Sequence, residues 1–354
     1  MRGFRSLAVL LSLLSCNCLP AFAGTQANGP DSYSGSYDRP GRPAIVGHRG
    51  AAGIRPENTL SSFREALELG ADALETDVHL TQDGVWVINH DFFLNPDVAR
   101  DGDGQWNAPK TPLSAMTYAQ IERYDIGRAR PGSAYAREHS ALVAVDGERV
   151  PTLDQLIALI RGHDDTTQLF LEIKSLPIVP GLSAGPEVLA RGVVQALNKN
   201  DFKQRTYVLC FDWNVLRAIH RLDPAIRLVF LTQDVKRALA RDDARALTNK
   251  DAHSVMQQMS GLDGLGGRSV GEAVRDEGGT IWDINYADIT AADLAQARHD
   301  HLRLGAWTVD DADTARLLYN LGVDYITTNR PDVMLQAFGK DAAVNAPLPP
   351  GASR

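Results

Sequence analysis

The chain has 354 residues, a formal net charge of −8 and 44% hydrophobic residues. Its acidic balance argues against nucleic acid or an anionic membrane surface as a general partner. The length can fill one large α/β barrel or two ordinary domains.

Residues 1–23 are typical of an export signal. Positive residues precede an apolar run at Leu7–Leu14, and Ala21-Phe22-Ala23 forms a small-x-small cleavage site. The run is too short to cross a bilayer, so we predict a periplasmic or secreted protein without stable membrane insertion. An uncleaved anchor is one alternative, and a lipid attached at Cys16 is another.

Cleavage of that signal would leave Cys210 as the single cysteine, so we expect no disulfide within the chain. Residues 24–42 are rich in Gly, Ser, Pro and Tyr without an apolar period, which predicts a flexible leader. Residues 339–354 have the composition of a flexible tail. The sequence gives no indication of the oligomeric state.

Between these tails, over residues 43–338, apolar runs of strand length alternate with helical patterns. The strand candidates are 44–48, 73–80, 85–89, 168–173, 206–211, 227–231, 280–284, 303–309 and 324–327. The helical candidates are 59–69, 152–161, 187–197, 213–222, 290–298 and 311–321. Repeated strand-then-helix units predict a parallel sheet.

Nine strand candidates are one too many for an eight-stranded barrel. Only Thr81–Gly84 separates the candidates 73–80 and 85–89, whereas a parallel crossover needs about a dozen residues or more. We therefore predict an antiparallel hairpin that returns to place His90 beside Glu75. Both would lie at the C-terminal face of the barrel, where active sites of this architecture are found.

Two long polar stretches interrupt the alternation. Residues 91–150 have little periodicity and predict an insertion over the catalytic face, as a lid or a substrate-binding segment. Within it, Asp101–Gly104 has the composition of a calcium loop but lacks the later ligands, so a turn is the preferred interpretation. Residues 241–275 form the second stretch, to which we assign no role.

Three carboxylates lie where they could meet. Glu75 and Asp77 occupy alternate positions of one strand candidate and so share a face, and Glu172 projects from another strand. Oxygen donors without cysteine or a His-x-x-x-His pattern favour one hard divalent cation, Ca²⁺ or Mg²⁺, over zinc. The alternative is that each acid pairs with a neighbouring arginine or lysine.

Two histidines follow strand candidates. Phosphoryl transfer from an ester requires proton removal from the attacking group and proton delivery to the leaving oxygen. Because histidine titrates near neutrality, His48 and His90 can divide these tasks, although the sequence does not assign base and acid between them. His79 lies further out on the hairpin and is not assigned to the site.

The remaining candidates would contact substrate. Arg49 offers a two-pronged donor and Lys174 a point charge, and both suit a phosphate. Trp307 would form a flat wall for an alcohol or a choline group, the latter through cation–π contact. A place in the barrel core is the alternative for this tryptophan.

These residues occur in motifs by which the chain, from about Pro43 to Phe338, resembles the glycerophosphodiester phosphodiesterases. In chain order the motifs are His48-Arg49-Gly50, Pro56-Glu57-Asn58-Thr59, Glu75-Thr76-Asp77-Val78, Leu80-Thr81-Gln82-Asp83-Gly84, His90-Asp91, Val150-Pro151-Thr152-Leu153, Leu171-Glu172-Ile173-Lys174, Trp307-Thr308-Val309 and Ile326-Thr327-Thr328-Asn329-Arg330-Pro331-Asp332. Each motif is weak by itself, but their order and spacing together are specific.

The resemblance implies a TIM-type (β/α)8 barrel with an insertion after His90-Asp91. It also implies hydrolysis of a glycerophosphodiester to sn-glycerol 3-phosphate and an alcohol. The roles that it implies are acid–base catalysis by His48 and His90, metal binding by Glu75, Asp77 and Glu172, and phosphate contact by Arg49 and Lys174. We expect calcium slightly more than magnesium, because an exported enzyme meets more of it. Asn329 stands where many members have Asp, and we expect it to affect only the packing of the last strand.

Two other functions are compatible with these residues. A lipid phosphodiesterase of the sphingomyelinase D or phospholipase D type resembles the same barrel and histidine pair, but such enzymes usually carry disulfides. A catalytically inactive secreted binding protein is the other, although decay of that kind should have removed a candidate ligand or histidine.

Overall fold

The computed structural model describes residues 41–177, 179–234 and 265–339. The predicted export signal, Cys16, nearly all of the leader and all but the first residue of the tail lie outside these ranges, as does most of the stretch 241–275. None of the helices within them is both long enough and apolar enough to span a membrane.

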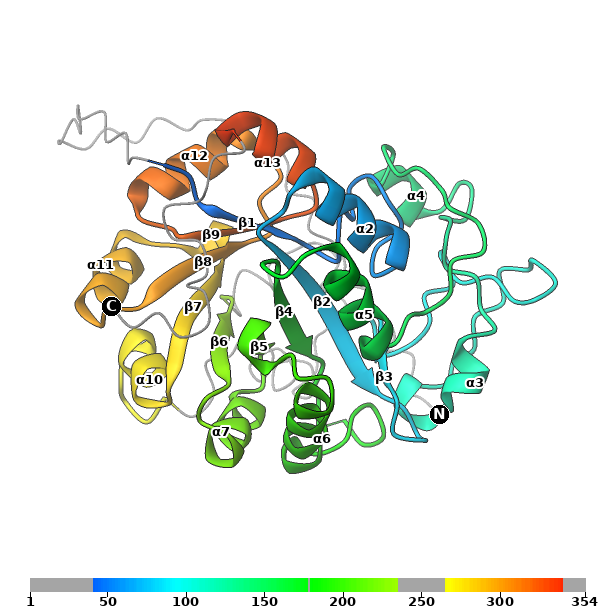
Figure 1. The fold of residues 1–354 in the computed structure, drawn as a ribbon, viewed down its shortest axis with the longest axis horizontal. Coiled ribbons are helices and arrows are strands. Elements are labelled where there is room, and N and C mark those ends of the chain that lie inside the picture. The colour runs from blue at the N-terminus through cyan, green and yellow to red at the C-terminus, as the bar shows by residue number, and fades with distance from the viewer. Residues whose placement is uncertain (1–40, 178, 235–264, 340–354) are drawn as a thin grey trace, which may run out of the picture.

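Eight parallel strands form a closed barrel at the centre of the molecule (Figure 1). They follow the order β1, β9, β8, β7, β6, β5, β4, β2, and pairing of β1 with β2 closes the ring. The bounds are β1 Ala44–Gly47, β2 Ala73–Leu80, β4 Gln168–Ile173, β5 Thr206–Cys210, β6 Arg227–Thr232, β7 Gly279–Asn285, β8 Arg303–Trp307 and β9 Tyr325–Thr328. The predicted TIM-type barrel is therefore confirmed.

A ninth strand, β3 (Trp86–Ile88), pairs antiparallel with the end of β2, with His79 opposite Val87. The connecting turn is stabilised locally: Thr81 Oγ1 accepts a hydrogen bond from the Val85 N–H, and Gly84 adopts a φ of +80° that few other residues tolerate. Beyond β3, the Asn89 N–H donates to the Asp77 carbonyl at 3.0 Å. The chain leaving β3 therefore returns to the level of the acids on β2.

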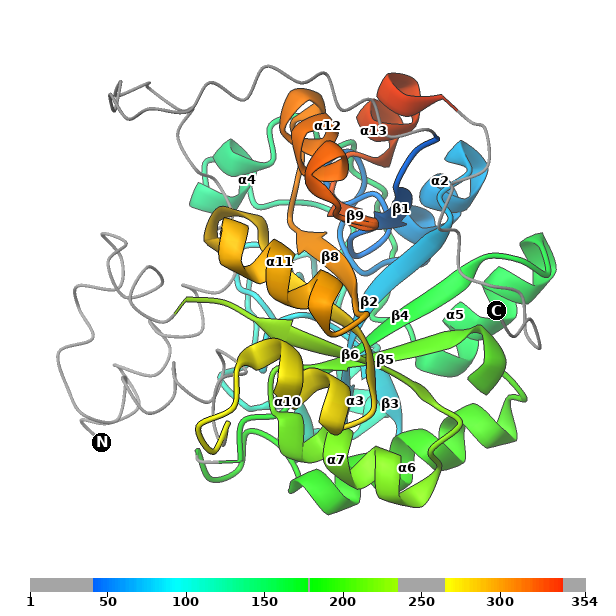
Figure 2. The ribbon, with the colours of Figure 1, turned by 90° about the vertical axis from the view of Figure 1, so that its left-hand side faces the viewer.

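Helices cover the outside of the barrel, as two views at right angles show (Figures 1 and 2). The major helices are α2 Leu60–Leu69, α5 Leu153–His163, α6 Pro186–Lys199, α7 Trp213–Leu222, α10 Val270–Asp276, α11 Ala291–His299, α12 Ala312–Leu321 and α13 Pro331–Phe338. Single 3₁₀ turns occur at η2 Lys203–Arg205 and η4 Tyr286–Asp288. Thr59 and Thr152 are the N-caps of α2 and α5, and the side chain of each accepts a backbone N–H of the first turn.

The segment between β3 and α5 lies to one side of the barrel, next to α2 (Figure 1). It contains η1 Leu113–Ala115, α3 Tyr118–Ile121 and α4 Ala134–Glu138. It has its own small core, which includes Leu94, Leu113 and Ile126. Asp101 Oδ1 accepts two backbone N–H groups of its own loop, in agreement with the predicted turn.

The interior of the barrel is apolar in its N-terminal half. Its buried side chains are Ala44, Val46, Ala73, Phe170, Tyr207, Leu209, Val229, Leu231, Ile281 and Tyr325. Alternate residues of a strand face the same way, so the next inward positions along β1, β2 and β4 are those of His48, Glu75 and Glu172. A second, larger core fills the space between the strands and the helices.

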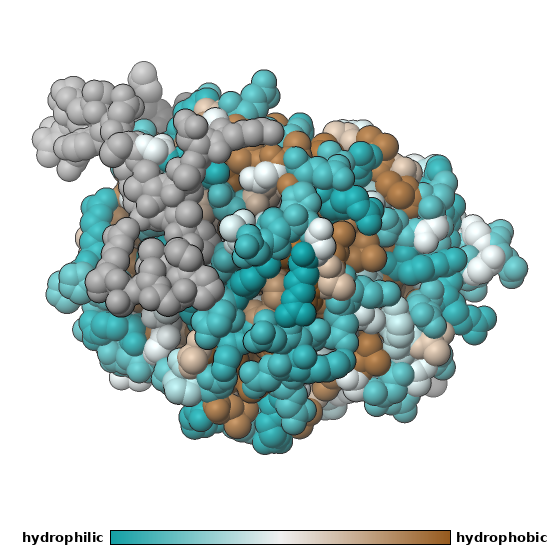
Figure 3. Space-filling model, viewed as in Figure 1, coloured by the Kyte–Doolittle hydropathy of each residue, from teal (hydrophilic) through white to brown (hydrophobic). Residues whose placement is uncertain are grey.

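The surface seen in Figure 3 is mostly polar, with apolar residues scattered over it. The exposed large apolar side chains are likewise dispersed along the chain, at Val143, Val188, Leu222, Leu317 and Leu321. Scattered apolar residues of this kind are normal for a folded surface.

Candidate active site

Glu75, Asp77 and Glu172 converge at the C-terminal end of the barrel. Ligand oxygens of the three lie within 4.8 Å of one another, and none of the residues is more than 9% exposed. Their meeting follows from the register, because β2 and β4 are parallel neighbours that place Asp77 opposite Glu172. The structure therefore brings together all three predicted metal ligands.

Lys174 lies among these acids. Its Nζ is 2.6 Å from Glu172 Oε1 and 2.7 Å from Asp77 Oδ1. Glu75 instead accepts the Arg49 backbone N–H at 3.0 Å, and its closest side-chain nitrogen is His48 Nε2 at 3.9 Å. The alternative of simple ion pairing thus accounts for two of the three carboxylates.

The charges of this cluster are strongly coupled. Burial, together with the neighbouring carboxylates of Asp77 and Glu172, raises the pKa of Glu75 well above its usual range. Burial also opposes ionisation of Asp77, but the neighbouring basic groups, Lys174 foremost and Arg49 among them, together outweigh it and hold the pKa of Asp77 well below normal. The protein therefore compensates the negative charge of Asp77, whereas ionisation of Glu75 remains unfavourable.

A tight turn after β1 positions Arg49, which has a φ of +49°. The turn is close-packed: a Cβ at Gly50 would lie 2.5 Å from backbone of Ser62. The Arg49 guanidinium contacts Glu57 Oε1 at 3.0 Å. Its Nε is buried without a hydrogen bond, although Asp77 Oδ2 is 3.5 Å away. A buried donor in this state is suited to a ligand that brings its own acceptor.

Asn58 contacts one of the three acids, although it was named above only within the motif Pro56-Glu57-Asn58-Thr59. Its Nδ2 donates to Asp77 Oδ2 at 2.8 Å, and its Oδ1 accepts the hydroxyl of Thr76 at 3.0 Å. Asn58 adopts a φ of +57°, in the left-handed region that Asn tolerates better than most residues, so this residue type suits the turn that carries it. It orients one of the three acids.

His48 is held from behind by an amide. Its Nδ1 lies 2.7 Å from Asn329 Oδ1, and Asn329 Nδ2 donates to Asp310 Oδ2 at 2.8 Å. This corrects our expectation that Asn329 affects only the packing of the last strand, because it touches a candidate catalytic residue directly. Burial, and then the Arg49 charge, lower the pKa of His48 to about 4.

His90 is held by a carboxylate instead. Its Nδ1 lies 2.9 Å from Asp91 Oδ1. Burial and the Glu57 charge raise the pKa of Asp91 to about 7, while burial and the Arg49 charge lower the pKa of His90 well below its usual range. His79 is fully enclosed below them, with Nε2 3.4 Å from the His90 carbonyl. The antiparallel pairing of β3 with β2 and the hydrogen bond from Asn89 to the Asp77 carbonyl therefore bring His90 to the same end of the barrel as the acids.

Trp307 is half-buried at the end of β8, so its side chain lies only partly in the barrel core. Its ring lies edge-to-face on Phe211 with centroids 5.5 Å apart, and its Nε1 lies 3.4 Å from the Asp283 carbonyl. Asp283 was not predicted. Its Oδ1 is buried without a partner, and burial followed by the Glu172 charge raises its pKa to about 8.

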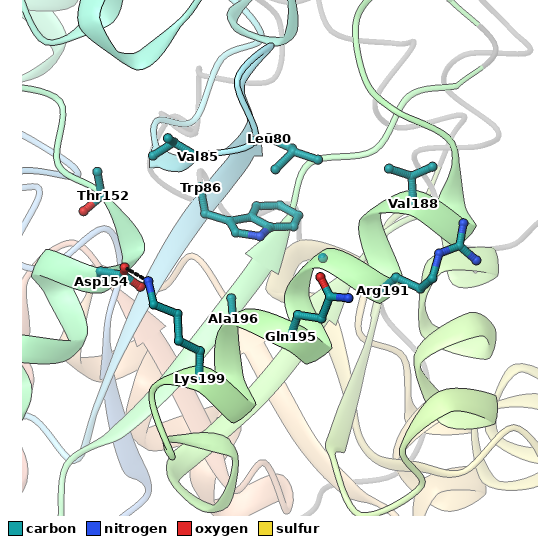
Figure 4. Close-up of a pocket in the computed structure, with 12 residues that line it drawn as sticks. Leu80, Val85, Trp86, Thr152, Asp154, Val188, Arg191, Gln195, Ala196 and Lys199 are labelled. Carbon is teal, nitrogen blue, oxygen red and sulfur yellow. Dashed lines mark hydrogen bonds and ion pairs between the residues drawn. The ribbon is translucent and has the colours of Figure 1, made fainter.

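A small cavity of about 20 Å³ is lined in part by Glu57, His90 and Asp91, and two larger ones lie within the described part of the chain. One of about 280 Å³ adjoins the candidate site and is lined in part by His48, Arg49 and Asn329. A groove of about 640 Å³ lies elsewhere, between the β2–β3 hairpin, the start of α5 and α6 (Figure 4). Its one lining carboxylate, Asp154, is paired with Lys199 at 2.7 Å, and it contains none of the candidate site residues. We therefore place the candidate active site beside the cavity of about 280 Å³.

The residues fit a divalent cation. Five carboxylates gather around the two basic side chains, Arg49 and Lys174; they are Glu57, Glu75, Asp77, Asp91 and Glu172. With both histidines held neutral by burial, ionisation of all five acids would leave negative charge in excess, and the raised pKa values of Glu75, Asp91 and Glu172 reflect that cost. Three adjacent oxygen donors suit a hard ion, which would remove that excess.

Comparisons with known proteins agree with this geometry. The glycerophosphodiester phosphodiesterase of Bacillus subtilis is 27% identical to this chain over 339 residues, covering 94% of this chain and 97% of the relative. That of Caldanaerobacter subterraneus is 26% identical over 297 residues, covering 84% of this chain and 98% of the relative.

Solved structures share the fold. A Silicibacter pomeroyi protein, named provisionally as a glycerophosphoryl diester phosphodiesterase, has a TM-score of 0.72 and 30% identity, covering 85% of this chain and 94% of its own. An Oleispira antarctica phosphodiesterase in complex with its product sn-glycerol-3-phosphate has a TM-score of 0.59 and 21% identity, covering 84% and 96%. Residues 48–333 match the sequence profile of the glycerophosphoryl diester phosphodiesterase family, and the chain belongs to that family.

Proposed function

We propose that the protein hydrolyses glycerophosphodiesters to sn-glycerol 3-phosphate and an alcohol, with one bound divalent cation. The observation that carries the proposal is the convergence of Glu75, Asp77 and Glu172 within 4.8 Å at the barrel end that also bears both histidines. Family membership supports it, and so does the fold shared with the Oleispira antarctica enzyme, whose product is sn-glycerol-3-phosphate.

Glu75, Asp77 and Glu172 are the residues that would hold the cation, with calcium slightly preferred to magnesium. A hard ion at this position supplies Lewis-acid stabilisation of charge on the phosphoryl oxygens. Arg49, whose Nε is buried without a hydrogen bond, contributes a further donor for the phosphate. Lys174 adds positive charge beside the same acids, and Trp307 provides an apolar wall.

The two histidines differ in the partner behind each ring, and this difference suggests their roles. His90 faces the Asp91 carboxylate, which stabilises an imidazolium beside the anionic phosphate, so His90 suits the acid that gives a proton to the leaving oxygen as the bond from phosphorus to that oxygen breaks. His48 is then the base, whose Nε2 accepts a proton from the attacking hydroxyl or water. Asn329 Oδ1 keeps the His48 Nδ1 protonated and leaves Nε2 to serve the substrate, because the Asn329 amide is itself oriented by Asp310.

An activity screen of the protein without residues 1–23 tests the function, using several glycerophosphodiesters with Ca²⁺, Mg²⁺ or excess chelator. We expect hydrolysis with an added ion and none with chelator. Glu172→Gln should require more metal for half-maximal activity, whereas the exposed control Glu122→Gln should not. Full activity in chelator would show that the acids are structural.

The same preparation distinguishes neighbouring reactions. Phosphorus NMR during turnover reveals whether a cyclic phosphate forms through attack by the glycerol 2-hydroxyl or whether water attacks directly. Faster cleavage of a lysophospholipid than of glycerophosphocholine would instead favour the lipid phosphodiesterase. Hydrolysis of no diester under any condition would favour a binding protein.

A further inference from the structure

The cavity beside His48 is built from parts of the chain that are distant in sequence. Its wall combines the turn after β1, the end of β9 and the segment that follows α4 in the insertion. The lining residues that carry charge are Arg49, Glu57, Glu138, Asp310 and Arg330, and the volume is about 280 Å³. It adjoins His48 and Arg49, so a group in it would be next to a phosphate held by Arg49.

Both arginines of this cavity have carboxylate partners. Arg49 Nη1 pairs with Glu57 at 3.0 Å. Arg330 donates from Nε and Nη2 to the two oxygens of Asp332, which is not part of the lining, at 2.9 and 2.8 Å. The positive charges of the wall are therefore balanced before any ligand enters.

Two lining carboxylates have no such balance. Asp310 accepts hydrogen bonds from neutral donors, the Thr328 hydroxyl and the backbone and side-chain N–H groups of Asn329. Glu138 is exposed at the end of α4. Within the described ranges, neither acid makes an ion pair within 4.0 Å. The cavity thus joins a phosphate-binding group, Arg49, to a wall of excess negative charge.

We propose that this cavity receives the alcohol part of the substrate and selects an alcohol that carries a primary ammonium group, as ethanolamine does. The inference rests on the proposed function and names its preferred substrate class. A phosphodiester of this kind is zwitterionic, and its two charges match Arg49 on one side and the two unbalanced acids on the other. No Trp, Tyr or Phe lines the cavity in the described part of the chain. A quaternary ammonium, which is best held by such rings, is therefore less suited than a donor of N–H groups.

The test compares kcat/KM for glycerophosphoethanolamine and glycerophosphoglycerol, which share the phosphate and differ in head-group charge. We expect the wild type to prefer the ethanolamine diester. Glu138→Gln should lower kcat/KM for that diester by about 2- to 5-fold, as expected for one partly exposed ion pair, and leave the glycerol diester unchanged. Glu138→Lys should lower kcat/KM for the ethanolamine diester further, and added salt should reduce the difference in kcat/KM between the two diesters.

Glu122→Gln is the matched control, because Glu122 is an exposed acid of the same insertion that does not line the cavity. Equal preferences in Glu138→Gln and Glu122→Gln, or a wild-type preference for the glycerol diester, would overturn the inference. If neither diester is hydrolysed, the proposed function fails separately. Calorimetric binding of the two diesters to wild type and Glu138→Gln then still decides whether the cavity favours the ammonium.

Discussion

The two halves of the barrel interior follow the same strand alternation but have opposite effects on the stability of the fold. In the N-terminal half the inward residues of β1 and β4 include Ala44, Val46 and Phe170, which are buried without polar groups to satisfy. Further along the same strands the inward residues are His48 and Glu172. The N-terminal half stabilises the fold by burying apolar surface, whereas the C-terminal half destabilises it by holding charged groups out of water.

The pKa values record this cost. Burial raises the pKa of Glu75 and lowers that of His48, so each group resists the charged form that it would adopt freely in water. Strain of this kind persists only where the surrounding structure enforces it. The stability supplied by the apolar half therefore allows the other half to hold buried charged groups. Four substitutions can test this comparison.

His90→Ala should have the largest effect, on activity alone. Removing a general acid or base costs about 10²- to 10⁴-fold in rate. The free energy of unfolding should change little by comparison, because burial keeps His90 in its neutral form and its removal takes no charge out of the site. Steady-state kinetics and urea unfolding measure the two quantities, with the exposed His163→Ala as control. Near-normal activity in His90→Ala would exclude the assigned role.

Phe170→Ala should act on the other half, and mainly on stability. Phe170 is 1% exposed and packs against Tyr207 and Tyr325, with ring centroids 4.8 and 5.6 Å apart. Its truncation should cost about 3–5 kcal/mol of unfolding free energy. Urea denaturation gives the value, and Phe170→Leu should lose much less. A loss below about 1 kcal/mol would show that the two halves do not differ as described.

Asp283→Asn tests the boundary between the halves through pH. The pKa of Asp283 is raised from 3.8 to about 8 in the folded protein, so the folded state holds its proton more tightly than the unfolded state. Wild-type stability should therefore fall as pH rises from about 4 through 8, by an amount on the order of 2–4 kcal/mol. Asparagine cannot ionise, so Asp283→Asn should be the more stable protein at pH 9 and not at pH 4.

Thermal unfolding of both proteins at these two pH values provides the measurement. A difference in melting temperature that does not grow with pH would mean that Asp283 is already ionised in the folded state, in contradiction to its burial without a partner for Oδ1.

Asn329→Ala should have the smallest effect. It removes the acceptor of His48 Nδ1 and should lower kcat by about 2- to 10-fold, the value of one hydrogen bond, with KM and stability nearly unchanged. Asn329→Asp keeps the acceptor and should recover most of the rate. The exposed Asn198→Ala is the control. If Asn329→Ala and Asn329→Asp lose equal activity, orientation of His48 is not the cause.

Most of the barrel could be predicted, because strand alternation and short connections are local properties. The meeting of Glu75, Asp77 and Glu172 also followed from strand order. Helices α10 and α13 were missed, although Ser269 and Glu272 form a capping box and Pro331 is a favourable first residue. These capping residues belong to short segments without a clear apolar period, so the helices that follow them were not predicted.

The contacts that tune the site could not be predicted. The Asn329–His48 hydrogen bond joins residues 281 positions apart, and only closure of the barrel brings them together. Asp283 sits opposite Gly305 in the register, and the absence of a side chain there provides its space: a Cβ at Gly305 would lie 2.4 Å from its Oδ1. Neither relation leaves a pattern in the neighbouring sequence.

Closure of the barrel also determines how much of the chain must be in place before the site is complete. Strand β1 pairs with β2 on one side and with β9, almost the last element, on the other. A growing chain that ends before Tyr325 already contains every predicted metal ligand and both histidines, yet β1 has an open edge and His48 lacks the amide that orients it. The site is therefore complete only once the final strand has paired with β1.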